Sequence, residues 1–394
     1  MDSEPGPAQG RLTMLIIDGD YPMAIGAMDL NRDLTLPLPE VRRAAADRFA
    51  EKNRPDAETM ASLPEMRRGG IAAALVKVVA RHYRSGSPLW GYRGPEMTYA
   101  AARAQLAYYQ MLEVRGEARI LRTGTDISDH LQLWSNSASR EGLSVGFILG
   151  MEGADPILET PQVARWWEDG IRVISLSHYG LSTYCHGTGT GTSGGLFPPA
   201  KALLREMDSA GMILDVTHAS DASVREALDL FGGPVLASHQ NCRAIVPGER
   251  QFPDDQLRAV IRRGGVIGAS MDSWMLYRPG LDWGGPIPPR RSVYSKEAVT
   301  LEDYCDHIDH VCQLAGNSRH AAIGGDTDGQ GGSGGAPAEV DTVADYRKVA
   351  GVLERRGYSS EAIENVMYRN WQRFFEAHLP QSGDAGPGNP AEGG

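Results

Sequence analysis

Short apolar runs alternate with amphipathic helical patterns along most of the 394 residues, and this alternation constrains the fold more than any other feature. Each run is followed by Gly, Asp, Glu or His, which is typical of a buried strand emerging from a sheet. Strands separated by helices pair in parallel, and eight such units predict a (β/α)8 barrel of the α/β class. The expected strands lie within residues 15–22, 70–80, 143–153, 171–180, 211–220, 233–241, 264–272 and 320–329.

The secondary structure of two segments remains open in this pattern. Residues 70–80 are long enough to form a helix instead of a strand, and residues 118–123 would add a ninth strand. We expect residues 118–123 to belong to an insertion between the second and third strands. The chain is long for an ordinary domain, so we expect residues 11–379 to form a single barrel domain with insertions. The flanking residues 1–10 and 380–394 are rich in Gly, Pro and acidic residues, and we expect them to be disordered.

Composition and charge argue against several classes of protein. A formal net charge of −11 argues against a nucleic-acid partner, which would require a basic surface. The sequence has neither a signal-peptide pattern at its start nor an apolar run of membrane-spanning length, so we expect a cytoplasmic protein with no membrane partner. The cysteines lack the spacing of a zinc ribbon, and we expect no disulfide framework among Cys185, Cys242, Cys305 and Cys312.

Polar residues stand where the apolar runs end. They are Asp18, Asp20, Glu152, His178, His218, His239, Asp272 and Asp326. Because active sites of (β/α)8 barrels form at the C-terminal ends of the strands, these side chains are expected to meet at one mouth. Three histidines among several carboxylates are typical of a metal site. The alternative for any single histidine is a hydrogen-bonded residue of the core.

The first strand carries two acids, Asp18 and Asp20, in the stretch LIIDGDYP. Residues i and i+2 of a strand point to the same side, so both carboxylates are expected to face the same space. Two like charges there repel each other unless a cation or a proton lies between them. The alternative is that the two acids cap a turn, a position that Asp favours.

Several stretches match the motifs of a known family in order. They are GMEGAD, GIRVISLSHYG, GMILDVTHAS, PVLASHQNCRAI, RQFPDDQLRAVIRRGGVIGAS, HIDHVCQLAG, HAAIGGDTDG and VMYRNWQRFF, with LPEMRRGGIAAA as a weaker upstream match. In these stretches, which lie between residues 143 and 376 apart from the upstream match, the sequence resembles the membrane (renal) dipeptidase family of the amidohydrolase superfamily. The resemblance implies a TIM-type barrel with two zinc ions that hydrolyses dipeptides, including those with a D or dehydro C-terminal residue.

The resemblance also implies roles for individual residues. Glu152 corresponds to the carboxylate that bridges two metal ions, and His218 and His239 complete the ligands of the second ion. Such a set leaves room for a water molecule, which is the arrangement of a catalytic zinc site. His186, in the loop HGTGTGTSGG, is a weaker candidate for a replacement ligand.

Three further residues correspond to positions that act on the substrate. By the resemblance, His178 contacts the scissile carbonyl oxygen, Arg250 holds the terminal carboxylate, and Asp326 is the general base and proton shuttle. Asp328 is an alternative for the last role. The alternatives for His178 and Arg250 are a core position and a solvated surface. We interpret His307 and His310, three residues apart on an expected helix, as structural.

The first strand departs from the family, which has DGHND where this chain has IIDGDYP. In one register Asp18 and Asp20 replace the family's His-x-Asp pair; in the other, Asp18 matches the leading Asp. The histidine is missing in both registers. Carboxylates favour harder ions such as Mn²⁺ or Mg²⁺ over zinc. The first site therefore has three alternatives: one of these ions, weakly bound zinc, or no ion.

These observations lead to one main functional hypothesis and two alternatives. The main hypothesis is a metal-dependent hydrolase, with one or two zinc ions, that cleaves a dipeptide or a small carboxylate-bearing amide. The first alternative is the same barrel acting on a non-dipeptide substrate in specialised metabolism. The second is a binding protein that has lost turnover. In each case we expect a small-molecule partner, and the resemblance allows a homodimer.

Overall fold

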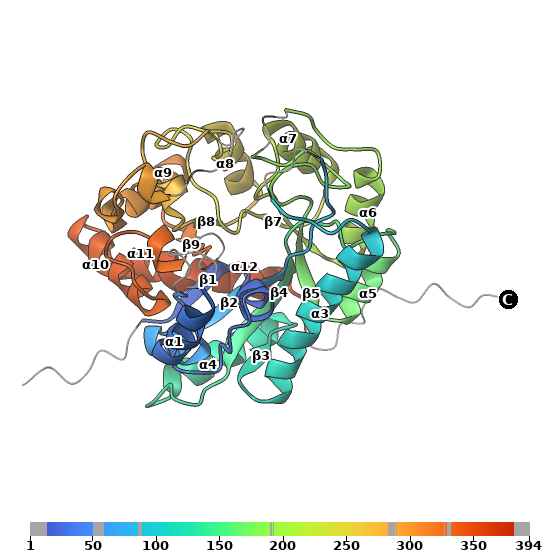
Figure 1. Ribbon diagram of the computed structural model, residues 1–394. Helices are drawn as coiled ribbons and strands as arrows, with labels where there is room; N and C mark the ends of the chain where they lie inside the picture. Colours follow the sequence, from blue (N-terminus) through green and yellow to red (C-terminus); the bar gives the residue numbers. More distant parts are fainter. Residues whose placement is uncertain are drawn as a thin grey trace, which may run out of the picture.

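Parallel strands curl into a barrel that is surrounded by helices (Figure 1). The computed structural model describes residues 14–49, 59–85, 89–189, 191, 193–282, 288, 290–326, 328 and 332–381. The strands are β1 (Ile16–Tyr21), β2 (Ile71–Val78), β3 (Ala118–Ile120), β4 (Val145–Met151), β5 (Ile171–Ser175), β6 (Ile213–Asp215), β7 (Val235–Leu236), β8 (Ile267–Ala269) and β9 (Ala321–Ile323).

Strand pairing follows the order of a (β/α)8 barrel. β1, β2, β4, β5, β6 and β7 pair in parallel in that order, and β8 pairs with β9. A parallel bridge between Ala237 and Ile267 joins the two sheets. The first and last strands meet where the backbone N–H of Asp326 donates to the carbonyl of Asp20 at 3.1 Å. The predicted barrel is therefore confirmed.

All eight expected strands are present, and residues 70–80 form a strand rather than a helix. Every residue of β2 is buried, as expected for a strand covered on both faces. The run 118–123 contains a ninth short strand, β3, which pairs with the first half of β4 at Val145–Phe147. The second half of β4, at Leu149–Met151, pairs with β5 instead. The insertion between β2 and β4 thus adds to the barrel wall.

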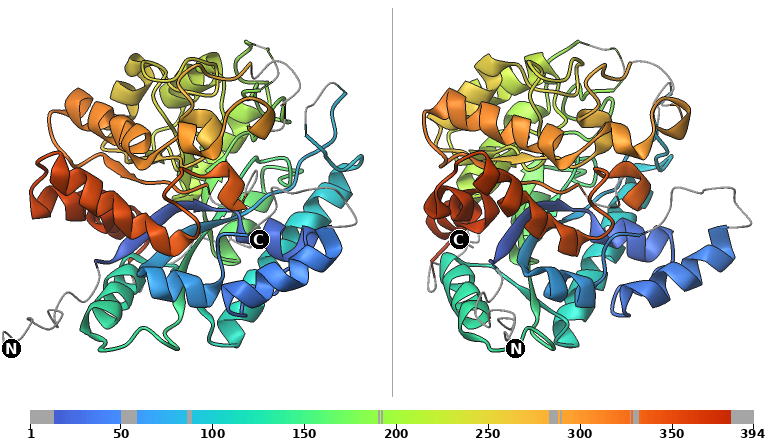
Figure 2. Two further views of the ribbon diagram at one scale, coloured as in Figure 1. Left: turned by 60° about the vertical axis from the view of Figure 1, so that its left-hand side comes forward. Right: turned by 90° about the vertical axis from the view of Figure 1, so that its left-hand side faces the viewer.

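Twelve α-helices cover the described part of the barrel, and the turned views show them stacked around the strands (Figure 2). They are α1 (Leu38–Phe49), α2 (Leu63–Gly69), α3 (Pro95–Val114), α4 (Gly124–Asn136), α5 (Gln162–Glu168), α6 (Ala200–Ala210), α7 (Asp221–Leu230), α8 (Asp254–Arg262), α9 (Leu301–Ala315), α10 (Lys348–Arg355), α11 (Ser360–Glu364) and α12 (Asn370–His378).

Helix α9 illustrates how local sequence signals define these elements. It begins with a capping box in which the Thr300 and Asp303 side chains accept each other's backbone N–H groups, and it ends at Gly316 with φ of 69°. On its buried face, His307 Nδ1 accepts the N–H of Cys242 at 3.0 Å. His310 Nε2 lies 2.7 Å from Asp254 Oδ1. Both histidines therefore connect α9 to neighbouring segments.

Three smaller expectations concern cysteines, membranes and chain ends. All four cysteines are free thiols. Among the described residues, no helix combines the length and the apolar character needed to cross a bilayer. The ends that we expect to be disordered lie outside the described residues, except for residues 380 and 381.

Candidate metal and catalytic site

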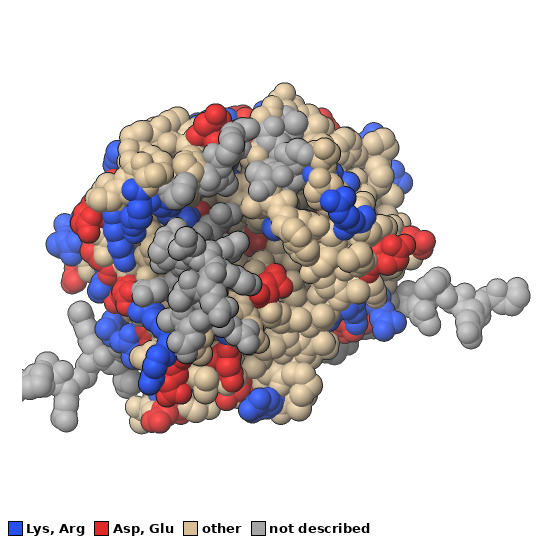
Figure 3. Space-filling view, in the orientation of Figure 1, with Lys and Arg blue, Asp and Glu red and all other residues tan. Residues whose placement is uncertain are grey.

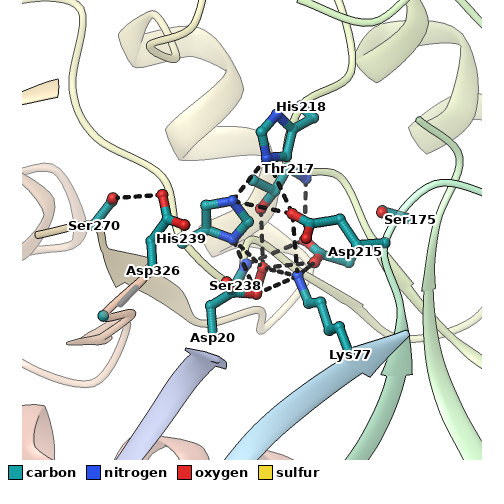
Figure 4. Close-up of polar contacts among 12 residues, drawn as sticks. Asp20, Lys77, Ser175, Asp215, Thr217, His218, Ser238, His239, Ser270 and Asp326 are labelled. Carbon is teal, nitrogen blue, oxygen red and sulfur yellow. Dashed lines mark hydrogen bonds and ion pairs between the residues drawn. The ribbon is translucent and has the colours of Figure 1, made fainter. Parts of the chain in front are cut away.

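The candidate residues lie at one end of the barrel, and a common spacing places them there. His178, His218, His239 and Asp326 each stand three residues after the last residue of β5, β6, β7 and β9. Glu152 directly follows β4, and Asp20 lies within the end of β1. Figure 4 shows Asp20, His218, His239 and Asp326 converging from separate strands.

Glu152, His218 and His239 form a compact group of metal-type donor atoms. Glu152 Oε1 lies 3.1 Å from His218 Nε2 and 3.3 Å from His239 Nε2. The two Nε2 atoms are 2.8 Å apart. All three residues are buried, and one donor atom from each lies within 4.8 Å of the others. Two nitrogens and an oxygen at this spacing fit a zinc-type ligand set.

The charges in this group also fit a cation. Burial, together with the positive charge of Arg250, holds the pKa of His218 well below its usual value, so its imidazole is neutral with a free lone pair. Burial opposes protonation of His239 too, but Asp20 and Asp326 outweigh it and raise its pKa. A proton on His239 Nε2 can therefore be shared with His218 Nε2. A metal ion would replace this proton between the same two nitrogens.

Two site residues adopt unusual backbone conformations. His218 has φ of 68° and Asp326 has φ of 56°, a left-handed region that residues other than glycine rarely enter. Each such residue costs about 1–3 kcal/mol, and such costs concentrate at functional sites. The His218 carbonyl accepts the N–H of Thr188 at 2.8 Å, which holds this turn in place.

His178 lies beside the group and is oriented by an arginine. Its Nε2 is 3.9 Å from Glu152 Oε1, and its ring centre is 4.4 Å from that of His218. Its Nδ1 is 2.8 Å from Nη1 of Arg81. Because a guanidinium only donates, Nδ1 accepts, and the proton of the neutral ring is on Nε2. Burial followed by Arg81 lowers the pKa of His178 well below its usual value, consistent with a neutral ring.

Arg250 is fully buried rather than on a solvated surface. Its Nη1 donates to Gln240 Oε1 at 2.7 Å, and its Nη2 donates to the His239 carbonyl at 3.1 Å. The same Nη2 lies 3.4 Å from His218 Nε2. The guanidinium therefore adjoins the candidate ligands.

The two acids of GGDTDG occupy different environments. Asp328 accepts hydrogen bonds from the Thr59 hydroxyl and, at 2.9 Å, from the Met60 N–H, which ties it to another segment. Asp326 accepts from the Ser270 hydroxyl at 3.3 Å and groups with Asp20 and His239. Burial, then the negative charges nearby, raise the pKa of Asp326 to about 7 despite His239. A carboxylate with such a pKa suits proton transfer near neutrality.

A cavity opens beside Asp326, and its lining includes Asp272 and Arg290. These two residues form a buried ion pair, with Arg290 Nη2 2.7 Å from Asp272 Oδ1. On the face shown in Figure 3, acidic and basic side chains are scattered over the described surface, and acidic atoms lie near its central hollow.

Comparison with known proteins identifies the family. A family model for membrane dipeptidases (peptidase family M19) matches residues 18–381. The chain belongs to this family. An uncharacterized dipeptidase of Schizosaccharomyces pombe is 27% identical over 235 residues, which are 59% of this chain and 53% of that protein. Dipeptidase verJ of Clonostachys rogersoniana is 29% identical over 238 residues, 59% and 55% of the two chains. This chain therefore spans about half the length of the curated relatives it matches.

Solved structures of membrane dipeptidases share the fold. A metallopeptidase from Rhodobacter sphaeroides, liganded with a phosphinate mimic of the dipeptide L-Ala-D-Ala, aligns with a TM-score of 0.69 at 19% identity, covering 93% of this chain and 99% of that one. The probable dipeptidase PvdM from Pseudomonas aeruginosa also gives 0.69, at 18% identity, with 92% and 95% covered.

The two first-strand acids are placed differently, because Asp20 belongs to a group of candidate ligands and Asp18 does not. Its Oδ1 accepts the N–H groups of Gly325, at 2.7 Å, and Asp20, at 3.2 Å, and Asp18 lies outside both groups of candidate ligands. Pairing between β1 and β2 shifts register between Asp18 and Tyr21, so the simple strand alternation fails there. Burial raises the pKa of Asp18 to about 7. This placement favours the register in which Asp18 matches the leading Asp of the membrane dipeptidase motif.

Asp20 faces the site, but beside a lysine that the sequence analysis missed. Lys77 Nζ, from β2, lies 2.6 Å from Asp20 Oδ1. Asp20 Oδ1 also lies 3.2 Å from His239 Nδ1. Burial opposes ionisation of Asp20, but His239 and Lys77 outweigh it and lower its pKa. A signal was present: Lys77 is the charged residue in the otherwise apolar run IAAALVKV.

His186 lies outside both groups of candidate ligands. Its ring packs on Phe197, with the ring centres 4.9 Å apart. Among the described residues, the two groups draw only on Asp20, Glu152, His218, His239 and Asp326.

Proposed function

We propose that this chain is a metal-dependent hydrolase that cleaves the amide bond of a dipeptide or a small carboxylate-bearing amide. The convergence of Glu152, His218 and His239 from the ends of β4, β6 and β7 carries this proposal. Membership of the membrane dipeptidase family supports it.

Zinc is the ion that this donor set favours, because it combines two imidazole nitrogens with one carboxylate oxygen. A zinc ion bound there lowers the pKa of water towards neutrality and polarises a carbonyl group. Three protein ligands are the number typical of a catalytic zinc site, whereas closed structural sites use four.

The surrounding residues have separate tasks. His178 donates its Nε2–H to the carbonyl oxygen of the scissile amide, a role that its orientation by Arg81 supports. Arg250 binds the free carboxylate of the substrate, since a guanidinium forms paired hydrogen bonds with carboxylates. Asp326 accepts the proton of the attacking water and delivers it to the leaving amine.

A substrate panel tests the proposed function directly. Protein loaded with zinc or manganese would be assayed with dipeptides carrying L or D C-terminal residues and with the matching dipeptide amides, which lack the carboxylate. We expect hydrolysis of free dipeptides, weaker hydrolysis of the amides, and loss of turnover in His218→Ala. His310→Ala serves as the matched control, because His310 on α9 contacts Asp254 on α8, outside the site. Unchanged turnover in His218→Ala would contradict the proposal.

The altered first strand supports a second candidate function. Lys77 forms an ion pair with Asp20, the acid that the family resemblance places at a metal-ligand position. A barrel changed in this way could act on a substrate other than a dipeptide, so the panel should include lactams, other amides and cyclic esters. Hydrolysis of one of these without hydrolysis of dipeptides would favour this candidate. Uniform inactivity, with retained metal binding, would point to a binding protein.

A further inference from the structure

Lys77 is a buried cation at the centre of the barrel mouth. Only 1% of its side chain is exposed, although it projects from the apolar strand β2. Its Nζ donates to Asp215 Oδ2 at 2.9 Å and to Ser238 Oγ at 2.7 Å. The third close partner is Asp20 Oδ1 at 2.6 Å. Two of its three N–H donors therefore form hydrogen bonds, and its contact with Asp20 is an ion pair.

The carboxylate of Glu152 is also close to the Lys77 ammonium group. Glu152 Oε1 lies 4.0 Å from Lys77 Nζ and on its other side contacts His218 and His239. Figure 4 shows the lysine side chain rising from β2 into the space between Asp20 and Asp215. The ammonium group thus occupies a position in contact with the acid of the first strand and adjacent to the acid of the proposed zinc site.

We propose that the Lys77 ammonium group takes the place of a second metal ion, so that this chain binds one divalent ion instead of two. The single ion is held by Glu152, His218 and His239, and Asp20 serves as the counter-ion of Lys77. This inference rests on the metal site of the proposed function, but it concerns metal count rather than substrate.

Charge balance supports a single ion. Asp20, Asp215 and Glu152 surround Lys77, and one ammonium group with one divalent ion neutralises these three carboxylates. A second divalent ion beside Asp20 would add two positive charges next to a buried ammonium group. Unbalanced charge in a buried site is strongly unfavourable.

The second group of candidate ligands, Asp20, His239 and Asp326, does not provide an independent site. It shares His239 with the first group, and its Asp20 oxygen already contacts Lys77. Asp18 belongs to neither group of candidate ligands, and its Oδ1 already accepts the backbone N–H groups of Gly325 and Asp20. An ion bound by this second group would therefore have to share His239 with the first ion and Asp20 with Lys77.

Metal counting tests the proposal. The purified chain would be stripped with a chelator, dialysed against excess zinc or manganese and then against metal-free buffer, and analysed for metal per chain. We expect one ion in the wild-type chain and two in Lys77→Met, where the freed carboxylates gain a cation. Lys201→Met, which removes an exposed lysine on α6, should keep one ion. Two ions or none in the wild type, or an unchanged count in folded Lys77→Met, would overturn the proposal.

A second measurement does not depend on how the variant folds. Anomalous diffraction from wild-type crystals grown with zinc would locate each ion. A single peak among Glu152, His218 and His239 is expected, and an additional peak against Asp20 would overturn the proposal. One ion without dipeptide hydrolysis would leave this inference intact while contradicting the proposed function. Two ions together with dipeptide hydrolysis would contradict this inference and support the proposed function.

Discussion

At the scale of single residues, the position of one proton on His178 decides what that side chain can do. Arg81 occupies Nδ1, so the ring presents an N–H group rather than a lone pair on the side of Glu152. An N–H group stabilises negative charge that develops on a carbonyl oxygen, whereas a lone pair would repel it. Arg81 is therefore a positioning residue in the proposed reaction.

Replacing Arg81 by methionine should lower kcat by about tenfold to a hundredfold with a smaller change in KM, because the proton is needed mainly in the transition state. Arg81→Lys, which keeps a donor, should recover part of the loss. Steady-state kinetics on the best dipeptide would measure both. Equal loss in the two variants, or a change confined to KM, would argue against this role.

Arg250 and Arg290 are two buried arginines at the same mouth, and they permit a matched comparison. Arg250 adjoins His218, whereas Arg290 pairs with Asp272. If Arg250 binds the substrate carboxylate, Arg250→Met should raise KM for free dipeptides by about a hundredfold, in line with about 1.5–3 kcal/mol for a charged hydrogen bond. KM for dipeptide amides should change much less. The same selective effect in Arg290→Met alone would transfer the role to Arg290.

At the scale of elements, helix α9 depends on a neutral histidine. Burial, then Arg278 and His310, lowers the pKa of His307 to about 3, while its Nδ1 accepts the Cys242 N–H. The pKa in the unfolded chain is near 6.5. Protonation therefore favours unfolding, and the stabilisation that is present above pH 6.5 is lost as the pH falls towards 3.

Between pH 7 and pH 4.5, protonation of His307 in the unfolded chain should lower the free energy of unfolding by about 2–3 kcal/mol. His307→Gln keeps an acceptor for Cys242 but does not titrate, so its stability should fall less over the same range. Urea unfolding at the two pH values, on wild type and variant in parallel, checks this. Parallel losses in the two proteins would contradict it.

The elements were largely predictable from the sequence, because buried parallel strands are continuous apolar runs and their ends carry the polar residues. This explains why eight strands and the positions of Glu152, His218, His239 and Asp326 were found. Side-chain direction at Asp18 was not predictable, since it depends on a register shift and on an N–H group from Gly325. Contacts such as Lys77 with Asp215, 138 residues apart, require the closed barrel.

At the scale of the whole molecule, the proposed ion would join three strands that are otherwise connected by backbone pairing. Glu152 follows β4, His218 follows β6 and His239 follows β7. A ligand that binds only the folded chain stabilises it by about 2.7 kcal/mol at a hundredfold excess over its Kd.

Chelation should therefore lower the Tm by about 3–4 °C, and added zinc should restore it. His218→Ala should melt at the same temperature with and without zinc. Differential scanning calorimetry on stripped and reloaded protein would show this. A Tm that does not respond to zinc in the wild type would contradict an ion shared among these strands.

The hydrogen bonds between β1 and the residues that follow β9 have a consequence for the order in which a ribosome builds the site. Gly325 donates to Asp18 across 307 positions, and the N–H of Asp326 donates to the carbonyl of Asp20. The proposed base is thus anchored to the first strand, although it is made after the other site residues. A nascent chain that has emerged only as far as β8 contains Glu152, His218 and His239 but no anchored base. Hydrolytic competence would then arise in one step, when β9 closes the barrel.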